Sequence, residues 1–442
     1  MKTIEAHGYS SIDELTKSNQ KILGRLFYLL GFTLCISRVF FGINMSISDV
    51  FMVLLVGYLL LMKKVVFSKQ LILFFIGVIC WRLLSTILLS SWVDTSVSLF
   101  SVIMTGQKFF VNLLYLILTI SILHINPELK KDFLSGVKVG TLFFGCLSMF
   151  IFLVAPASLK SFVLFGDLRL KGFMNDPNYF AYLQTCGYCI WYLRPFKGKW
   201  KNLIAFMGYT SCILLSASKT GVVAFLVINL LSASKTGVVA FLVINLLFLI
   251  QKLFRKNINV KHLVMTIMTA SVLIIGTHFL FADYVSNLIA RFLSIPQFVR
   301  FEGVFTNFYG AIVAGGSGRT EAWKTAQLLL TRTHFMGIGF VDYSSVALSV
   351  SGSPTIAHNT FLQIAVEWGI VPAMMGMLLV FGQFVRKLLL KKWLLCLLIL
   401  ANIIFSFSIS LQNSRLLWIL VGLLVVKEQG SLVNGKKEQS ND

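Results

Sequence analysis

Three stretches of the 442-residue chain carry residue types suited to phosphate binding and proton transfer. LRLKGFMNDPNYFAY places Arg169 and Lys171 just before Gly172, and arginine offers the forked donors that phosphate oxygens need. In GGSGRTEAWKTAQLLL, Arg319 opens a predicted helix, where backbone dipoles already favour an anion. In AHNTFLQIAVEWG, His358 can exchange a proton near neutral pH. These residues predict an anion site beside a proton-exchanging group.

Structural alternatives exist for the residues around both arginines. Asp176 and Pro177 are typical of a helix start, with the aspartate at the N-cap and the proline at the first helical position. The helix that follows the glycine-rich stretch should place Trp323, Ala326 and Leu330 on one face, which is typical of an interfacial helix lying on the bilayer.

The histidine and the charged residues within apolar runs also have alternatives. His358 and Asn359 together can be a helix cap, and His334 competes for the proton-exchanging role. Charges such as Arg82 and Glu367 inside apolar segments are expensive in a bilayer and usually functional, although these two can also pair with each other.

Composition indicates that the elements positioning these stretches span a membrane. Hydrophobic residues make up 57% of the chain and charged residues only 13%, against about a quarter in a soluble domain. The net charge of +22 does not indicate nucleic acid, because the basic residues lie in short loops between apolar runs rather than on one soluble face.

Apolar runs of bilayer length predict an all-α integral membrane protein with about 12 transmembrane helices and one long extracytoplasmic loop. With the N-terminus in the cytoplasm, most of the 39 Lys and Arg fall on the cytoplasmic side. The predicted spans, apart from the one through the duplicated segment described next, are 22–41, 47–62, 70–90, 108–124, 133–155, 177–193, 202–217, 262–283, 359–381, 393–411 and 413–426.

A sixteen-residue sequence, LLSASKTGVVAFLVIN, occurs twice in succession over 214–245. An extra crossing by the surplus copy would invert every later basic loop, against the charge rule. Its apolar part is also too short to span as a helix. We therefore expect the surplus copy not to cross the membrane.

The resulting organisation has five parts. We predict a cytoplasmic tail over 1–21, transmembrane helices over 22–283, a large extracytoplasmic loop with an interfacial helix over 284–358, transmembrane helices over 359–426 and a cytoplasmic tail over 427–442. Cys186 and Cys189 form C-x-x-C inside a span, where packing is the favoured interpretation over redox or metal chemistry. Neither outer loop holds a dense Asp/Glu cluster, so no metal or cofactor is predicted.

Four stretches resemble the O-antigen ligase and O-antigen or capsular polysaccharide polymerase family of bacterial membrane proteins. They are RLKGFMNDPNYFA, LLSASKTGVVAF, GRTEAWKTAQLLLTRTHFMGIG and AHNTFLQIAVEWGIV. They cover the C-terminal two thirds of the chain, and the rest matches only as apolar helices. Where many relatives have Ser-Arg-Ser-Gly, this chain has Ser-Ala-Ser-Lys-Thr-Gly, twice.

The resemblance implies a metal-independent glycosyltransferase at the outer face of the bacterial cytoplasmic membrane. Its donor would be a glycan on polyprenyl pyrophosphate, and its partners would be membrane lipid and other polysaccharide-assembly proteins. Arg169 and Arg319 would bind the pyrophosphate, and His358 would orient or deprotonate the acceptor hydroxyl. The further residues predicted to bind substrate are Lys171, Gly172, Asn178, Glu321, Asn359 and Glu367.

Polymerisation of capsular or exopolysaccharide repeat units is the favoured activity, and ligase-type transfer to a different acceptor is the first alternative. A transporter would also have many spans, but it should carry charges near the midplane in both halves of an internal repeat. A non-enzymatic scaffold for glycan assembly would tolerate mutation of the site residues.

Overall fold

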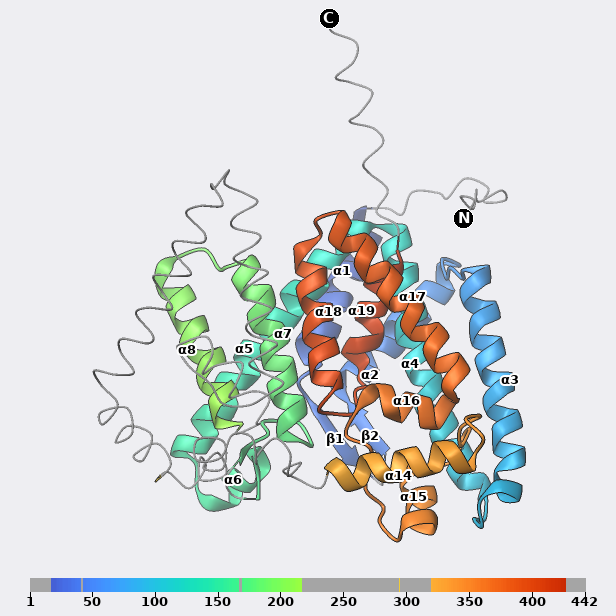
Figure 1. Cartoon of the computed structure of the whole chain (residues 1–442). Helices are drawn as coiled ribbons and strands as arrows, with labels where there is room; N and C mark the ends of the chain where they lie inside the picture. The colour runs from blue at the N-terminus through green and yellow to red at the C-terminus, as the bar shows by residue number, and fades with distance from the viewer. Residues whose placement is uncertain (1–16, 41–42, 167–168, 217–293, 295–318, 427–442) are drawn as a thin grey trace, which may run out of the picture.

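The computed structural model describes residues 17–40, 43–166, 169–216, 294 and 319–426 (Figure 1). Two short antiparallel hairpins interrupt an otherwise helical chain: β1 (Ser37–Phe40) with β2 (Ile43–Ser46), and β3 (Leu164–Phe165) with β4 (Arg169–Leu170). The helices are α1 (Lys17–Thr33), α2 (Ile47–Leu61), α3 (Lys69–Trp92), α4 (Leu99–Ile125), η1 (Pro127–Leu129), α5 (Lys130–Val154), α6 (Ala157–Val163), α7 (Pro177–Leu193), α8 (Lys199–Leu215), α14 (Arg319–Arg332), α15 (Tyr343–Ser351), α16 (Thr360–Trp368), α17 (Ile370–Leu389), α18 (Trp393–Ser406) and α19 (Arg415–Val425).

Four helical segments of the described chain are long and apolar enough to cross a membrane: α3, α4, α17 and the continuous unit Pro127–Val154. Three shorter apolar helices, α2, α18 and α19, accompany them. The predicted helical fold is therefore confirmed, and these segments fit the predicted membrane protein by their length and composition. The number of twelve spans stays a prediction, because the duplicated segment and the span at 262–283 lie outside the described residues.

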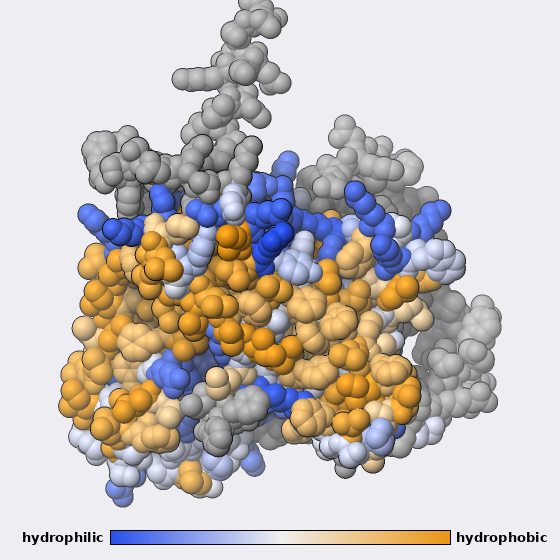
Figure 2. Space-filling model, turned by 180° about the vertical axis from the view of Figure 1, so that it is seen from behind, coloured by the Kyte–Doolittle hydropathy of each residue, from blue (hydrophilic) through white to orange (hydrophobic). Residues whose placement is uncertain are grey.

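Large apolar side chains cover the outside of the helical body. Leu73 and Ile87 on α3 and Leu153 on α5 are each about 70% exposed. Figure 2 shows an apolar belt with hydrophilic residues gathered along its upper edge. A surface of this kind matches contact with lipid acyl chains rather than water.

Small residues let the helices inside the body approach closely. Gly136 and Gly140 are four residues apart on α5 and face α1; a Cβ at either would lie 2.1 Å from a carbonyl oxygen, that of Tyr28 or that of Phe32. Small residues at this spacing are typical of helix contacts in membranes, where close backbone approach supplies the packing energy. Any larger residue at these two positions would push α1 away from α5.

The predicted continuous span at 359–381 is wrong, because the chain breaks into α16 and α17 at Gly369. Its φ is +87°, a conformation that glycine adopts without strain. A Cβ there would lie 2.4 Å from the carbonyl oxygen of Met336, and the amide of Ile370 donates to the Phe335 carbonyl at 2.9 Å. The break thus packs the turn after α14 against the junction of the two helices.

The elements that carry the sequence-predicted site residues gather toward one end of the helical body. Figure 1 places β1, β2, α6, α14 and α15 at this end, opposite the start of α1 and the end of α19. The buried face of α14 comprises Ala322, Thr325, Ala326, Leu329 and Leu330, whereas Trp323 is 42% exposed. Ala326 and Leu330 face α15 and α16, whereas Trp323 lies at the exposed edge of the same face, and its contact with the bilayer stays a prediction.

Candidate functional site

Arg169 is held at the start of β4 by two different segments. Its Nε donates to the Ser216 carbonyl at 3.1 Å, and its guanidinium also donates to the Asn178 side-chain oxygen at 3.0 Å. Asn178 lies in the first turn of α7, where the carboxylate of Asp176 accepts from the backbone amides of Asn178 and Tyr179 at 2.7 and 3.3 Å. The aspartate is thus the N-cap that its position before Pro177 predicts, and it brings a negative charge near Arg169.

Gly172 and Lys171 lie in the turn that follows Arg169. Gly172 has φ +57°, and a Cβ there would meet the Phe180 ring at 2.5 Å, so tight packing alone accounts for the glycine. Its carbonyl accepts from Arg38 at 3.4 Å, and Arg38 also lies over the Phe162 ring at 4.9 Å. Burial, and then the positive charge of Arg38, lower the pKa of Lys171.

Arg319 is the first described residue of α14; the residues before it lie outside the described part of the chain, so the predicted helix start at Arg319 stays a prediction. Its guanidinium donates to the Ser408 carbonyl at 3.4 Å, in the loop between α18 and α19. Glu321 lies in the first turn of the same helix and is exposed. Arg319 thus joins the described start of α14 to the loop that precedes α19.

His358 lies between α15 and α16 with φ +48°, and the next residue, Asn359, caps α16 by accepting from the Leu362 amide at 3.1 Å. Burial of the imidazole, and then the positive charge of Arg319, lower the pKa of His358, while the carboxylate of Asp176 opposes that shift. His358 therefore lies within electrostatic range of both Arg319 and the Asp176 cap. His334 is elsewhere, edge-on to Trp92 with ring centroids 5.9 Å apart.

The loop over 407–414 is the common support of this neighbourhood. Besides holding Arg319 at Ser408, it offers the carbonyl of Ile409 to Thr360 of α16 at 2.8 Å and the carbonyl of Ser410 to the Tyr179 hydroxyl of α7. Three elements far apart in sequence thus meet on three consecutive carbonyls. Sequence reasoning missed this role, because the predicted span at 393–411 runs through the first part of the loop, whereas α18 ends at Ser406.

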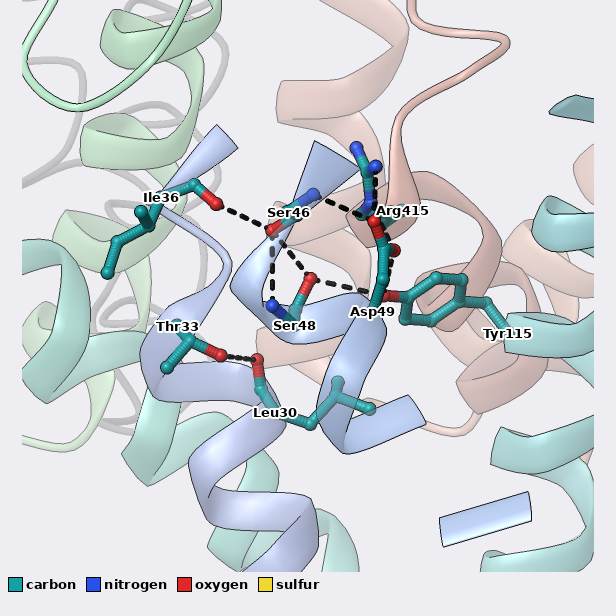
Figure 3. A network of polar contacts seen from close by, with 8 residues as sticks. All are labelled: Leu30, Thr33, Ile36, Ser46, Ser48, Asp49, Tyr115 and Arg415. Atoms are coloured by element: carbon teal, nitrogen blue, oxygen red, sulfur yellow. Dashed lines mark hydrogen bonds and ion pairs between the residues drawn. The ribbon is translucent and has the colours of Figure 1, made fainter. Parts of the chain in front are cut away.

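A largely buried ion pair fixes this loop to the N-terminal hairpin (Figure 3). The carboxylate of Asp49 accepts from Arg415 through two nitrogens, each at 2.7 Å, and from the Tyr115 hydroxyl at 2.7 Å. It also accepts from the Ser46 amide at 2.8 Å, completing a capping box at the start of α2. Figure 3 shows Ser48 between Ser46 and Tyr115, so the network joins the hairpin to α4 and α19.

Loss of this pair is expected to destabilise the whole site. Arg415→Ala leaves the Asp49 carboxylate, whose side chain is 20% exposed, without its cation, at a cost on the order of 3 kcal/mol. We expect a clear fall in the Tm of the detergent-solubilised protein. The matched control is Lys131→Ala, which breaks an exposed surface pair with Glu128 and should change stability by less than about 1 kcal/mol. Equal Tm values for wild type and Arg415→Ala would contradict this role.

Arg82 and Glu367 do not form the ion pair that the sequence left open. In the described part of the chain, the Arg82 guanidinium donates instead to the Gly339 carbonyl at 2.8 and 3.2 Å, with the Phe340 ring 4.1 Å away. Glu367 is buried at 9% exposure and accepts from two glutamines. Glu367 is thus buried and hydrogen-bonded within the protein, and its predicted role in substrate binding stays a prediction.

Asp49 and Arg415 are the residues that sequence reasoning missed. Ser46 and Asp49 have the spacing of a capping box, a signal that predicts a helix start at this position. No sequence pattern links Asp49 to Arg415, which lies 366 residues away. Within the described ranges, no three His, Cys, Asp or Glu side chains gather in a metal-binding arrangement.

Apolar helices long enough to cross a membrane carry, at one end of the body, an imidazole within electrostatic range of Arg319. Residues 220–381 match the family model described as O-antigen ligase, and this match confirms the resemblance read from the sequence. The matched region contains Arg319 and His358, whereas Arg169 lies before it. No curated protein matches the chain.

Proposed function

We propose that the protein polymerises polysaccharide repeat units carried on polyprenyl pyrophosphate, at the outer face of the bacterial cytoplasmic membrane. The O-antigen ligase domain supports ligase- or polymerase-type glycan transfer in general, and it gives no support to the transporter alternative. The observation that carries the proposal is the common neighbourhood of Arg319, His358 and the Arg169–Asp176 turn.

The transfer step follows from the chemistry of these side chains. An acceptor hydroxyl attacks the anomeric carbon of the donor while His358 takes the hydroxyl proton. The bond from the anomeric carbon to the pyrophosphate oxygen breaks, releasing polyprenyl pyrophosphate. Arg169 and Arg319 stabilise the negative charge that grows on this leaving group. We propose that these cations do this without a metal.

The state of His358 fits a base. An imidazole takes a proton only when it is neutral, and burial together with Arg319 favours the neutral form.

Activity should therefore persist below the ordinary histidine pKa of about 6.5 and fall as pH drops through the lowered value. Arg319→Gln removes one of the causes of the lowering, so the acidic limb of the residual rate should move to higher pH. Initial polymerisation rates from pH 5 to 8 would show this. An unmoved acidic limb would contradict electrostatic coupling between the two residues.

Purified protein in liposomes tests polymerase against ligase. Supplied only with lipid-linked repeat units, a polymerase should produce a ladder of longer lipid-linked glycans and release one polyprenyl pyrophosphate per bond formed. A ligase should do nothing until a different acceptor is added, which is the alternative activity. The ladder should persist in EDTA, and its loss there would overturn the metal-independent mechanism.

A further inference from the structure

Glu367 is a buried carboxylate at the meeting point of two glutamine side chains. Its Oε1 accepts from Gln363 Nε2 at 2.8 Å and from Gln412 Nε2 at 3.2 Å. Both glutamines are themselves buried, at 2% and 6% exposure. A carboxylate is costly to bury unless it is hydrogen-bonded, so the two amide donors are what stabilise it there.

One arm of this arrangement reaches the backbone next to His358. Gln363 uses both ends of its amide: Nε2 donates to Glu367, and Oε1 accepts from the backbone amide of Ala357 at 3.1 Å. Glu367 therefore fixes which way the Gln363 amide points. His358 follows directly with φ +48°, a conformation that costs a non-glycine residue about 1 kcal/mol and persists only where its neighbours are held.

The second arm reaches the loop that supports Arg319. Gln412 lies in the 407–414 loop, and its own carbonyl accepts from Trp418 Nε1 of α19 at 2.8 Å. Four residues earlier, the Ser408 carbonyl accepts from Arg319. One carboxylate thus joins the backbone that carries His358 to the loop that holds Arg319.

We propose that Glu367 is a positioning residue that sets the place of His358 relative to Arg319 through Gln363 and Gln412. The expected effect of Glu367 on catalysis rests on the proposed function. The position of His358, in contrast, can be measured on the protein without substrate. The proposal predicts that an acceptor oxygen at position 367 is needed to hold His358 in place, whereas the negative charge of the carboxylate is not needed. Glu367→Gln keeps an oxygen for both glutamines, whereas Glu367→Leu removes it.

The test follows His358 directly in the full-length protein. Modification by diethyl pyrocarbonate, measured by mass spectrometry on the peptide containing His358 across pH 5 to 8, reports the pH midpoint of that imidazole. The charges facing His358 are Arg319 on α14 and Asp176 at the start of α7.

In Glu367→Leu and Gln363→Leu, His358 should become less buried and less tightly held beside Arg319. Its midpoint should then rise by roughly half a pH unit, about a threefold change in the ratio of charged to neutral imidazole. Glu367→Gln should keep the wild-type midpoint. Polymerisation should fall in the two leucine variants and be largely retained in Glu367→Gln.

A wild-type midpoint in both leucine variants would overturn the proposal. If Glu367→Leu does not fold, Gln363→Leu and Gln412→Leu still test the two arms separately. The proposed function fails on a different result, namely full polymer from His358→Ala. If His358→Ala makes no polymer and the His358 midpoint is unchanged in the two leucine variants, the proposed function stands and only the positioning role is overturned.

Discussion

Replacing Arg319 or Arg169 with alanine is expected to reduce polymer formation by about two to three orders of magnitude at equal membrane abundance. Removing one fixed donor aimed at a developing negative charge typically has an effect of this size. Arg319→Lys should recover only part of the rate, because the ammonium keeps the charge and loses the fork that matches pyrophosphate oxygens. The measurement is initial polymerisation rate on lipid-linked repeat units.

Arg332→Ala is the matched control for Arg319. It removes an exposed arginine from the last turn of the same helix and should leave polymer formation near wild type. Full-length polymer at wild-type rate from both Arg169→Ala and Arg319→Ala would eliminate the pyrophosphate role of these residues.

His358→Ala is expected to lower the transfer rate by about two to four orders of magnitude, the usual contribution of a positioned general base. Single repeat units should accumulate on the lipid carrier, while the amount of folded protein in the membrane stays unchanged. Gel separation of lipid-linked glycans by length would measure both the loss of polymer and the accumulation.

Two variants separate catalysis from folding. His334→Ala removes the other histidine of the loop and should leave polymer length unchanged, because that ring lies against Trp92 rather than beside Arg319. Asn359→Ala removes the α16 cap, at a cost of about 1 kcal/mol in stability, and should lower the rate less than His358→Ala does. The reverse pattern for the two histidines would move the proton-transfer role to His334.

Local signals in the sequence were sufficient for much of the helical framework. The helix predicted at 177–193 has the bounds of α7, because Asp176 and Pro177 mark its start; its crossing of the membrane stays a prediction. Arg319 lies on α14, a helix that the sequence also predicts. These features depend on residues within one or two turns of each other, which is the range over which capping and apolar periodicity act.

The features that the sequence did not reveal depend on tertiary contacts. The break at Gly369 is set by the turn at Met336, and a lone glycine in an apolar run does not predict it. The Asp49–Arg415 pair and the support of Arg319 by Ser408 join residues that no pattern connects. Glu367 has the residue type of a ligand-binding group, and only its burial between glutamines separates it from the exposed Glu321. The placement of the duplicated segment at 214–245 stays a prediction.

The central claim is tested most directly by the chain-length distribution of surface glycan in a deletion strain with and without the wild-type protein. The account predicts that the deletion leaves single repeat units on the lipid carrier and that the wild-type protein restores long polymer. Normal-length polymer that fails to reach its final acceptor would assign the protein to the ligase alternative. A surface glycan unchanged by the deletion would contradict glycan transfer altogether.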